Sequence, residues 1–238
     1  LAEGATWKTI LNGTALGYKV LNADGTHKWY APDDVNGSQL NNVIINSLPI
    51  TTKNLSFKVD GTNVKGNKVE RGTTVQLCAG CNAKDVTVEF SILKKGETTP
   101  ITLSGNDVQY TTVGTGTTKF YVAEYAFNDV GSYTISFTAT KDGYTVTSTP
   151  KKLTVTKAAI PASAITTPAA NALTYNGNKQ ILATAGSVDA KYGEMQYRLG
   201  TSGSFSTAIP TATDAGTYTV YYKVVGAEGY NDTTAQSI

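Results

Sequence analysis

The sequence predicts an all-β fold made of two antiparallel β-sandwiches in tandem, preceded by a short β-rich N-terminal remnant. Short runs of alternating apolar and polar residues recur along the chain, one Asp-x-Gly-x-Tyr phrase occurs twice, and almost no stretch has the period of a helix. Only 16% of the 238 residues are charged, and Thr, Ser, Asn and Gly take their place. Such a mixture suits the exposed faces of strands and tight turns.

The repeated phrase places a similar strand in each predicted sandwich. Its two copies begin at Asp129 and Asp214, about 85 positions apart. Each copy resembles the tyrosine corner of immunoglobulin-like sandwiches, in which the tyrosine hydroxyl bonds to a backbone group just upstream. The resemblance implies this structural role for Tyr133 and Tyr218. The position two residues after each tyrosine is apolar rather than Cys, so we expect sandwiches without an inter-sheet disulfide.

Residues 1–48 match neither sandwich and form the predicted N-terminal remnant or cap. An Asn-Ala-Asp-Gly turn signal at 22–25 separates two short runs suited to strands, 18–20 and 28–30. We therefore expect a β-hairpin in this segment.

Residues 49–157 contain the strand pattern of one complete sandwich. In the run 86–92, Val and other apolar residues alternate with Thr, Glu and Ser, which is the pattern of a half-buried strand. Tyr133 begins a second run of the same kind, and turn signals recur about every ten residues. The predicted strands of this segment are 55–59, 74–77, 86–92, 120–122, 133–140 and 152–156.

Residues 158–238 repeat this plan after a short linker. A Tyr-Asn-Gly-Asn turn at 175–178 precedes an apolar run, and the runs 195–199 and 218–224 alternate as the earlier strands do. Because the sequence ends soon after the last of these runs, we expect the final strand of this sandwich to be missing.

The C-terminal third carries a more specific order of motifs. Leu-Thr-Tyr-Asn-Gly-Asn-Lys-Gln at 173–180 is followed by Gly-Glu-Met-Gln-Tyr at 193–197 and by the second Asp-x-Gly-x-Tyr phrase. This order resembles the MBG-type repeats of bacterial surface proteins, especially those of large secreted proteins from gut Gram-positive bacteria. The middle segment is similar to bacterial immunoglobulin-like domains in general. The resemblance implies immunoglobulin-like sandwiches within a secreted or cell-surface protein.

Charge and hydropathy exclude several classes of partner. The formal net charge is +2 with no basic run, so we expect no nucleic-acid partner. No stretch approaches the roughly 18 apolar residues of a membrane span, so we expect no membrane insertion within this sequence. We interpret the chain as a piece of a longer polypeptide, extracellular and monomeric, which is secreted or anchored to the cell surface through parts outside it.

Cys78 and Cys81 are the only cysteines, and the sequence places them between a strand and a turn. No helical pattern follows them, which argues against a redox-active pair. The usual four zinc ligands cannot be assembled from two cysteines and one histidine. In an oxidising extracellular setting we expect a local disulfide that closes a very small loop. Its stabilisation would lie at the low end of the range of about 2–4 kcal/mol, and we assign both residues a structural role.

No set of residues has the spacing of a catalytic or metal site. His27 with Asp24 or Asp33 and Ser38 lacks any nucleophile-elbow signature, and a lone surface histidine is the simpler interpretation. The Asp-Gly turns lack the alternating acidic ligands of a calcium loop. We therefore expect no catalytic residues, no metal, no cofactor and no enzymatic activity.

The main functional hypothesis is a non-catalytic extracellular spacer or adhesion scaffold from a large bacterial surface protein. The alternative is a carbohydrate-binding segment, accessory to a polysaccharide-degrading enzyme, whose partner is a polysaccharide or host glycan. Sugar rings stack on exposed flat aromatic side chains, although tryptophan is usually buried in a core. In this alternative the ligand-binding residues are Trp7, His27, Trp29, Tyr30 and Tyr221.

Overall fold

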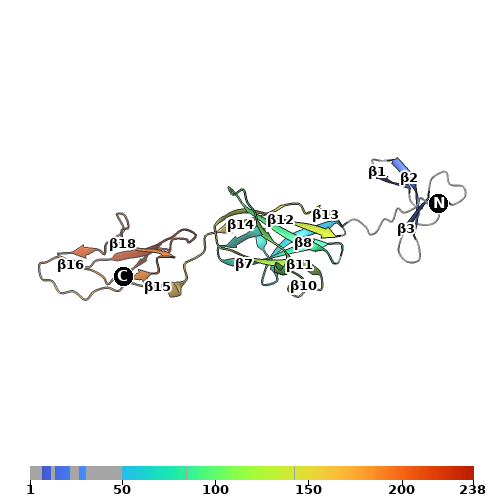
Figure 1. Ribbon diagram of the computed structural model, residues 1–238. Coiled ribbons are helices and arrows are strands. Elements are labelled where there is room, and N and C mark those ends of the chain that lie inside the picture. The colour runs from blue at the N-terminus through green and yellow to red at the C-terminus, as the bar shows by residue number, and fades with distance from the viewer. Residues whose placement is uncertain (1–6, 12–13, 22–26, 31–49, 84, 142) are drawn as a thin grey trace. The chain divides into compact units, whose positions relative to one another are not determined.

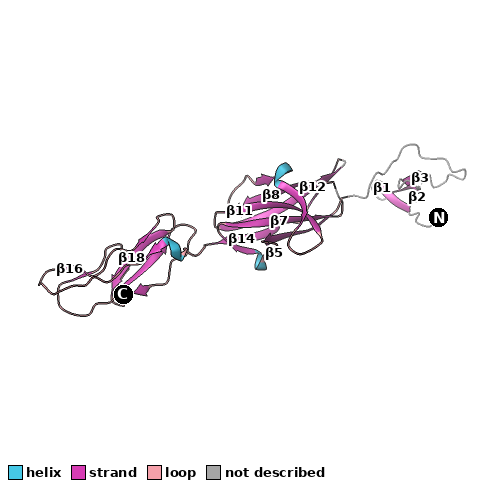
Figure 2. Ribbon diagram, turned by 90° about the horizontal axis from the view of Figure 1, so that it is seen from below, coloured by secondary structure: helices cyan, strands magenta, loops and turns pink. Residues whose placement is uncertain are grey.

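The computed structural model describes residues 7–11, 14–21, 27–30, 50–83, 85–141 and 143–238, and the structural statements below concern these ranges (Figure 1). For the first three ranges it describes the backbone alone. Within the described residues the chain is all-β, as the sequence predicts. Helix in these ranges is limited to three short 3₁₀ turns, η1 (Lys65–Asn67), η2 (Gly105–Asp107) and η3 (Ala162–Ala164) (Figure 2). No helix in this part of the chain is long and apolar enough to cross a membrane.

The chain divides into two compact units, Leu1–Pro49 and Ile50–Ile238. The first unit contains an antiparallel sheet of three strands in chain order, β1 (Trp7–Leu11), β2 (Thr14–Leu21) and β3 (His27–Tyr30). The pairing of β2 with β3 is the hairpin that the sequence predicts.

The second unit begins with two sheets formed by residues 50–157, which we call the two-sheet segment. All its strand pairs are antiparallel except β6 with β14. The first sheet has the order β10-β11-β7-β4-β5, with β4 (Thr52–Val59), β5 (Thr62–Asn63), β7 (Thr73–Cys81), β10 (Val108–Thr112) and β11 (Lys119–Phe127). The second has the order β6-β14-β12-β8-β9, with β13 also paired to β12; its strands are β6 (Lys68–Glu70), β8 (Thr87–Lys94), β9 (Ile101–Leu103), β12 (Gly131–Lys141), β13 (Tyr144–Thr147) and β14 (Lys151–Thr156).

Both sheets contribute side chains to one apolar core. Along β8 and β12 every second side chain is buried, because successive side chains of a strand point to opposite faces of the sheet. The rings of Phe90 and Phe137, which are register partners, lie 6.0 Å apart. Each large apolar side chain that is fully buried contributes about 1.5–3 kcal/mol. The buried residues of these two strands include Val88, Phe90, Ile92, Tyr133, Ile135, Phe137 and Ala139.

Residues 158–238 form the C-terminal segment, which has shorter strands in three small antiparallel sheets. The first two sheets pair β15 (Ile165–Thr166) with β17 (Ser187–Val188), and β16 (Gln180–Ile181) with β19 (Thr211–Ala212). The third has the order β18-β20-β21, with β18 (Gly193–Leu199), β20 (Val220–Gly226) and β21 (Gln236–Ser237). The short strand β21 pairs with β20 through two residue pairs, Tyr221 with Ser237 and Tyr222 with Gln236. Ile238 also exchanges two backbone hydrogen bonds with Val220, each 3.0 Å long. The expectation that this segment is truncated at its last strand stays a prediction.

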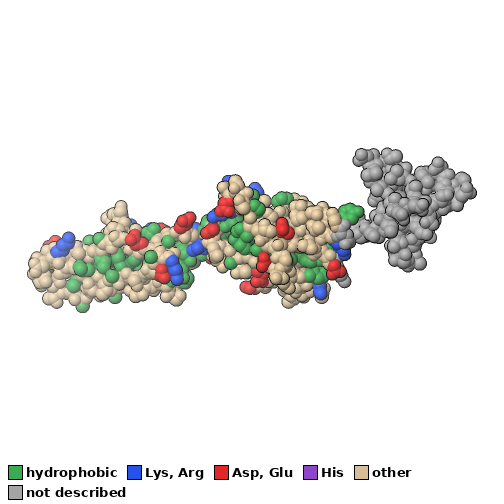
Figure 3. Space-filling model, in the orientation of Figure 1, with side chains coloured by type: hydrophobic (Ala, Val, Ile, Leu, Met, Phe, Trp, Pro, Cys, Tyr) green, Lys and Arg blue, Asp and Glu red, His purple; other side chains and the backbone are tan. Residues whose placement is uncertain are grey.

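The core of the C-terminal segment is small. Four residues form its buried centre, Met195, Tyr197, Val220 and Val224, against twenty in the two-sheet segment. Figure 3 shows hydrophobic side chains at its surface, in the part of the molecule that Figure 1 colours orange to red. We therefore expect this segment to draw less stability from burial than the two-sheet segment does.

Both tyrosines of the repeated phrase make the hydrogen bond expected from the sequence. The Tyr133 hydroxyl donates to the Asp129 carbonyl at 2.8 Å, and the Tyr218 hydroxyl donates to the Asp214 carbonyl at the same distance. Tyr133 is only 3% exposed, and burial, with the Asp129 charge as a lesser cause, raises its pKa to about 12. The hydroxyl therefore stays protonated and able to donate. The Tyr218 bond lies at the surface.

We expect Tyr133→Phe to lower the free energy of unfolding of the two-sheet segment by about 1–2 kcal/mol, because a hydrogen bond made by a buried side chain is lost. Tyr218→Phe should cost less, about 0.5 kcal/mol, because water can replace a hydroxyl at the surface. Urea unfolding followed by circular dichroism measures both changes. Tyr144→Phe, at a tyrosine that is 55% exposed, is the control that should leave stability unchanged. An unchanged transition in Tyr133→Phe would contradict the structural role of this bond.

Candidate functional site

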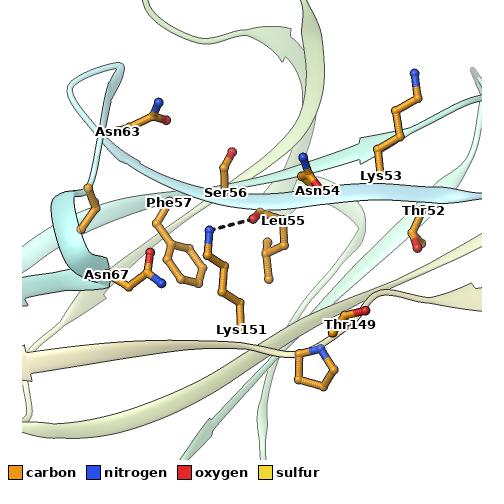
Figure 4. A pocket seen from close by; sticks show the side chains of 12 residues that line it. Thr52, Lys53, Asn54, Leu55, Ser56, Phe57, Asn63, Asn67, Thr149 and Lys151 are labelled. Atoms are coloured by element: carbon orange, nitrogen blue, oxygen red, sulfur yellow. Dashed lines mark hydrogen bonds between the residues drawn. The ribbon is translucent and has the colours of Figure 1, made fainter.

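A groove of about 610 Å³ runs beside β4 in the two-sheet segment. It lies between the first residues of β4, in the first sheet, and the start of β14, in the second (Figure 4). Twelve residues line it: Thr52, Lys53, Asn54, Leu55, Ser56, Phe57, Asn63, Val64, Asn67, Thr149, Pro150 and Lys151.

The groove exists because, among the described strands, only β5 lies along the outer edge of β4, and it covers only part of that edge. On its inner side β4 pairs with β7 from Thr52 to Lys58, with an irregular register between Thr52 and Leu55. On its outer side β5 pairs only with Lys58 and Val59. In the described part of the chain no strand pairs with the outer edge of β4 before Lys58.

The turn that follows β4 explains why β5 is so short. Asp60 and Gly61 both have positive φ, 47° and 76°, which is the geometry of a tight two-residue hairpin turn. The chain returns beside β4 for two residues and makes one further bond, from the Val64 N–H to the Phe57 carbonyl at 2.9 Å. It then enters η1 and leaves β4.

Lys151 crosses the groove from the second sheet. Its ammonium donates to the Leu55 carbonyl at 3.2 Å and lies 5.3 Å from the centre of the Phe57 ring (Figure 4). A lysine that reaches across an open strand edge hinders uncontrolled pairing of that edge with other strands. Lys151 therefore occupies one of the hydrogen-bonding positions that a neighbouring strand would use.

The groove combines positive charge with amide and hydroxyl groups. Among the described residues, its lining includes two lysines, Lys53 and Lys151, and no acidic residue. Asn54, Asn63 and Asn67 add side-chain amides, while Leu55 and Phe57 contribute apolar surface from the core. Such a lining can bind hydrogen-bonding and negatively charged groups. Elsewhere in the described residues, no three His, Cys, Asp or Glu side chains cluster closely enough to hold a metal ion.

The aromatic residues of the carbohydrate hypothesis lie mainly in the first unit. Trp7 and Tyr30 are both register partners of Tyr18, on either side of β2, and Trp29 partners Lys19. His27 begins β3. The structure describes only the backbone of these four residues. Asp24, Asp33 and Ser38 lie outside the described residues. The hypothesis that Trp7, His27, Trp29 and Tyr30 bind a sugar therefore stays a prediction.

Tyr221 is half-buried on β20, with a cation over its ring. The Arg198 guanidinium lies 5.2 Å from the Tyr221 ring and 4.7 Å from the Phe205 ring. Tyr222, its neighbour, packs against the core of the C-terminal segment. One side of the Tyr221 ring thus already has a cation as its partner, which leaves less of that ring for a sugar.

The structure corrects the disulfide expected between Cys78 and Cys81. Both cysteines are free, and both lie inside β7 rather than in a loop. Three residues of extended strand separate α-carbons by about 10 Å, whereas a disulfide needs them within about 7 Å. The two thiols also pack in different clusters, Cys78 with Val113 and Val122, and Cys81 against the main core. Burial raises the pKa of both thiols, which keeps them protonated and poorly reactive.

None of the residues that line the groove is among the site residues predicted from the sequence. The one local signal is the Asp60-Gly61 turn, which forecasts a hairpin but not that its second strand stops after two residues. The other wall comes from Thr149 to Lys151, about 90 positions later, and no sequence pattern links the two.

No protein-family model matches the chain, and no curated protein matches it either. The resemblance to MBG-type repeats and to bacterial immunoglobulin-like domains therefore rests on the motifs themselves.

We expect the native protein to contain two free thiols under non-reducing conditions. Intact-mass measurement should show no loss of two hydrogens relative to the reduced chain. In a Cys81→Ser variant, Cys78 should react with a thiol reagent only after unfolding, because its side chain is fully buried. Rapid labelling of native Cys78, or a mass lower by two hydrogens, would contradict the strand geometry described above.

Proposed function

We propose that residues 50–238 serve as a non-catalytic spacer or adhesion scaffold in a larger extracellular bacterial protein. In this proposal the two-sheet segment and the C-terminal segment are immunoglobulin-like sandwiches in tandem, the second of the MBG type. The observation that carries the proposal is a set of contacts around Lys157 and Ala158, directly after β14. A spacer holds its two ends at a fixed distance only if the connections between its segments resist bending.

Backbone hydrogen bonds tie the linker to the C-terminal segment directly after β14. The Ala158 N–H donates to the Gly229 carbonyl at 3.0 Å, and the Asn231 N–H donates to the Ala158 carbonyl at 2.9 Å. The Asn231 side-chain amide also donates to the Lys157 carbonyl at 3.3 Å. Ala158 follows the end of β14 by two residues, so little unpaired chain remains between the two segments.

Arg71 adds a side-chain contact at the same joint. Its backbone N–H donates to the Thr156 carbonyl at 2.9 Å, and its Nε donates to the Asn128 carbonyl at 2.9 Å, which fixes the arginine to the two-sheet segment. The guanidinium lies 4.7 Å from the centre of the Tyr230 ring, and Tyr230 packs edge-on against Tyr192, with ring centres 5.0 Å apart. A cation over an aromatic ring contributes about 0.5–2 kcal/mol.

Gly229 permits this close approach. A β-carbon at Gly229 would lie 2.6 Å from Cδ of Arg71, and its φ of +87° is one that other residues rarely adopt. The two tyrosine corners and the weakly charged, Thr- and Asn-rich composition also support an immunoglobulin-like spacer.

We expect Arg71→Ala to loosen the joint without unfolding either segment. In the native protein, NMR relaxation should give residues 50–157 and 158–238 a common rotational correlation time, and in Arg71→Ala the two segments should show separate and shorter times. Arg198→Ala is a matched control, because it removes the same side chain from two aromatic rings away from the joint. Independent tumbling of the two segments in the native protein would refute the rigid spacer.

A binding screen of the whole chain against starch, xylan, mannan and mucin distinguishes the carbohydrate-binding alternative from the spacer. As a spacer, the chain should not be retained on any of them. Retention that is lost in Trp29→Ala but kept in Tyr144→Ala, an exposed aromatic of the two-sheet segment, would replace the spacer by a carbohydrate-binding module.

A further inference from the structure

We propose that the groove along β4 binds an extended acidic peptide, which adds a strand to the open edge of the first sheet. This interaction surface is additional to the spacer role and does not depend on the joint at Arg71. In such strand addition, backbone hydrogen bonds supply affinity and side-chain contacts supply selectivity.

The backbone of β4 already presents hydrogen-bonding groups to the groove. The N–H and the C=O of one strand residue point toward the same edge, and alternate residues point to opposite edges. The Leu55 carbonyl faces the groove, because it accepts from Lys151 there, and the Phe57 carbonyl faces the same way, because it accepts from Val64. The Leu55 N–H therefore also faces the groove. An incoming strand can exchange two backbone hydrogen bonds with Leu55.

Lys151 makes the exchange selective for an acidic partner. Its ammonium now fills the position of a strand N–H at the Leu55 carbonyl. When a peptide N–H takes that position, the ammonium must find another acceptor, since an unpaired and partly buried charge is costly. A glutamate or aspartate of the peptide supplies it, and Lys53 adds positive charge to the same lining, whose described residues include no acid.

The same charges disfavour a second copy of this chain as the occupant. An antiparallel pair of two copies about Leu55 would bring the two Lys151 ammonium groups, one from each copy, to the same short stretch of edge. Like charges that face each other across strands are destabilising. The irregular register between Thr52 and Leu55 further limits pairing to a short segment. About five residues of strand, or roughly 17 Å, fit along the open edge.

The test uses the full chain and synthetic peptides of about eight residues, in which Val and Thr alternate with two Glu. NMR titration measures affinity, and hydrogen exchange of the Leu55 amide reports strand addition. We expect binding that slows exchange at Leu55. A matched peptide with Gln in place of Glu should bind about tenfold more weakly, and a peptide N-methylated at its groove-facing amides should not bind.

Two lysines on β14 provide a matched pair of variants. Lys151→Gln should reduce the affinity for the acidic peptide about tenfold, whereas Lys152→Gln, at an exposed lysine outside the groove, should leave it unchanged. Circular dichroism verifies that both variants are folded. No peptide binding, binding without slower exchange at Leu55, or equal loss in both variants overturns the proposal. Concentration-dependent dimers that protect Leu55 without peptide, or binding of a neutral oligosaccharide in its place, would overturn the choice of partner.

Discussion

The burial of one face of each sheet against the other is the interaction on which the two-sheet segment depends. The pleat sends alternate side chains of β8 and β12 inward, where they meet residues of β4, β7 and β11 from the opposite sheet. This arrangement buries the inner faces of both sheets, but it leaves the backbone groups along their edge strands without partners from the core. Along β4 the hairpin after Asp60 closes only the last residues, and Lys151 reaches across the remainder. The candidate binding groove is thus a consequence of the same packing that makes the core.

Much of the architecture can be predicted from short stretches of sequence, because it depends on the alternation of apolar and polar residues within each stretch. The alternation at 86–92 and 133–140 predicts the buried faces of β8 and β12, and the phrases at Asp129 and Asp214 predict the hydrogen bonds of Tyr133 and Tyr218. These features need only neighbours within a few residues, so one sequence suffices to find them.

The features that could not be predicted depend on distant pairings or on a misleading local signal. Lys151 and Leu55 are 96 positions apart, and nothing near either residue indicates their contact. The sequence places Cys78 and Cys81 after the end of a strand, yet β7 continues to Cys81, because β11 pairs with it as far as Ala79 and β4 pairs with it as far as Cys81. Tertiary pairing here overrides the weak strand preference of Ala and Gly.

The position of both cysteines inside β7 sets a kinetic competition during folding in an oxidising compartment. In the unfolded chain the two thiols are close enough in sequence to be oxidised to a small ring, and that ring is too short to span the extended strand that the native sheet requires. Folding that buries Cys78 before oxidation protects it, whereas oxidation first would exclude β7, the strand that links β4 to β11, from the sheet. The native protein would then form efficiently only if sheet assembly outpaces thiol oxidation, which takes seconds to hours depending on the oxidant.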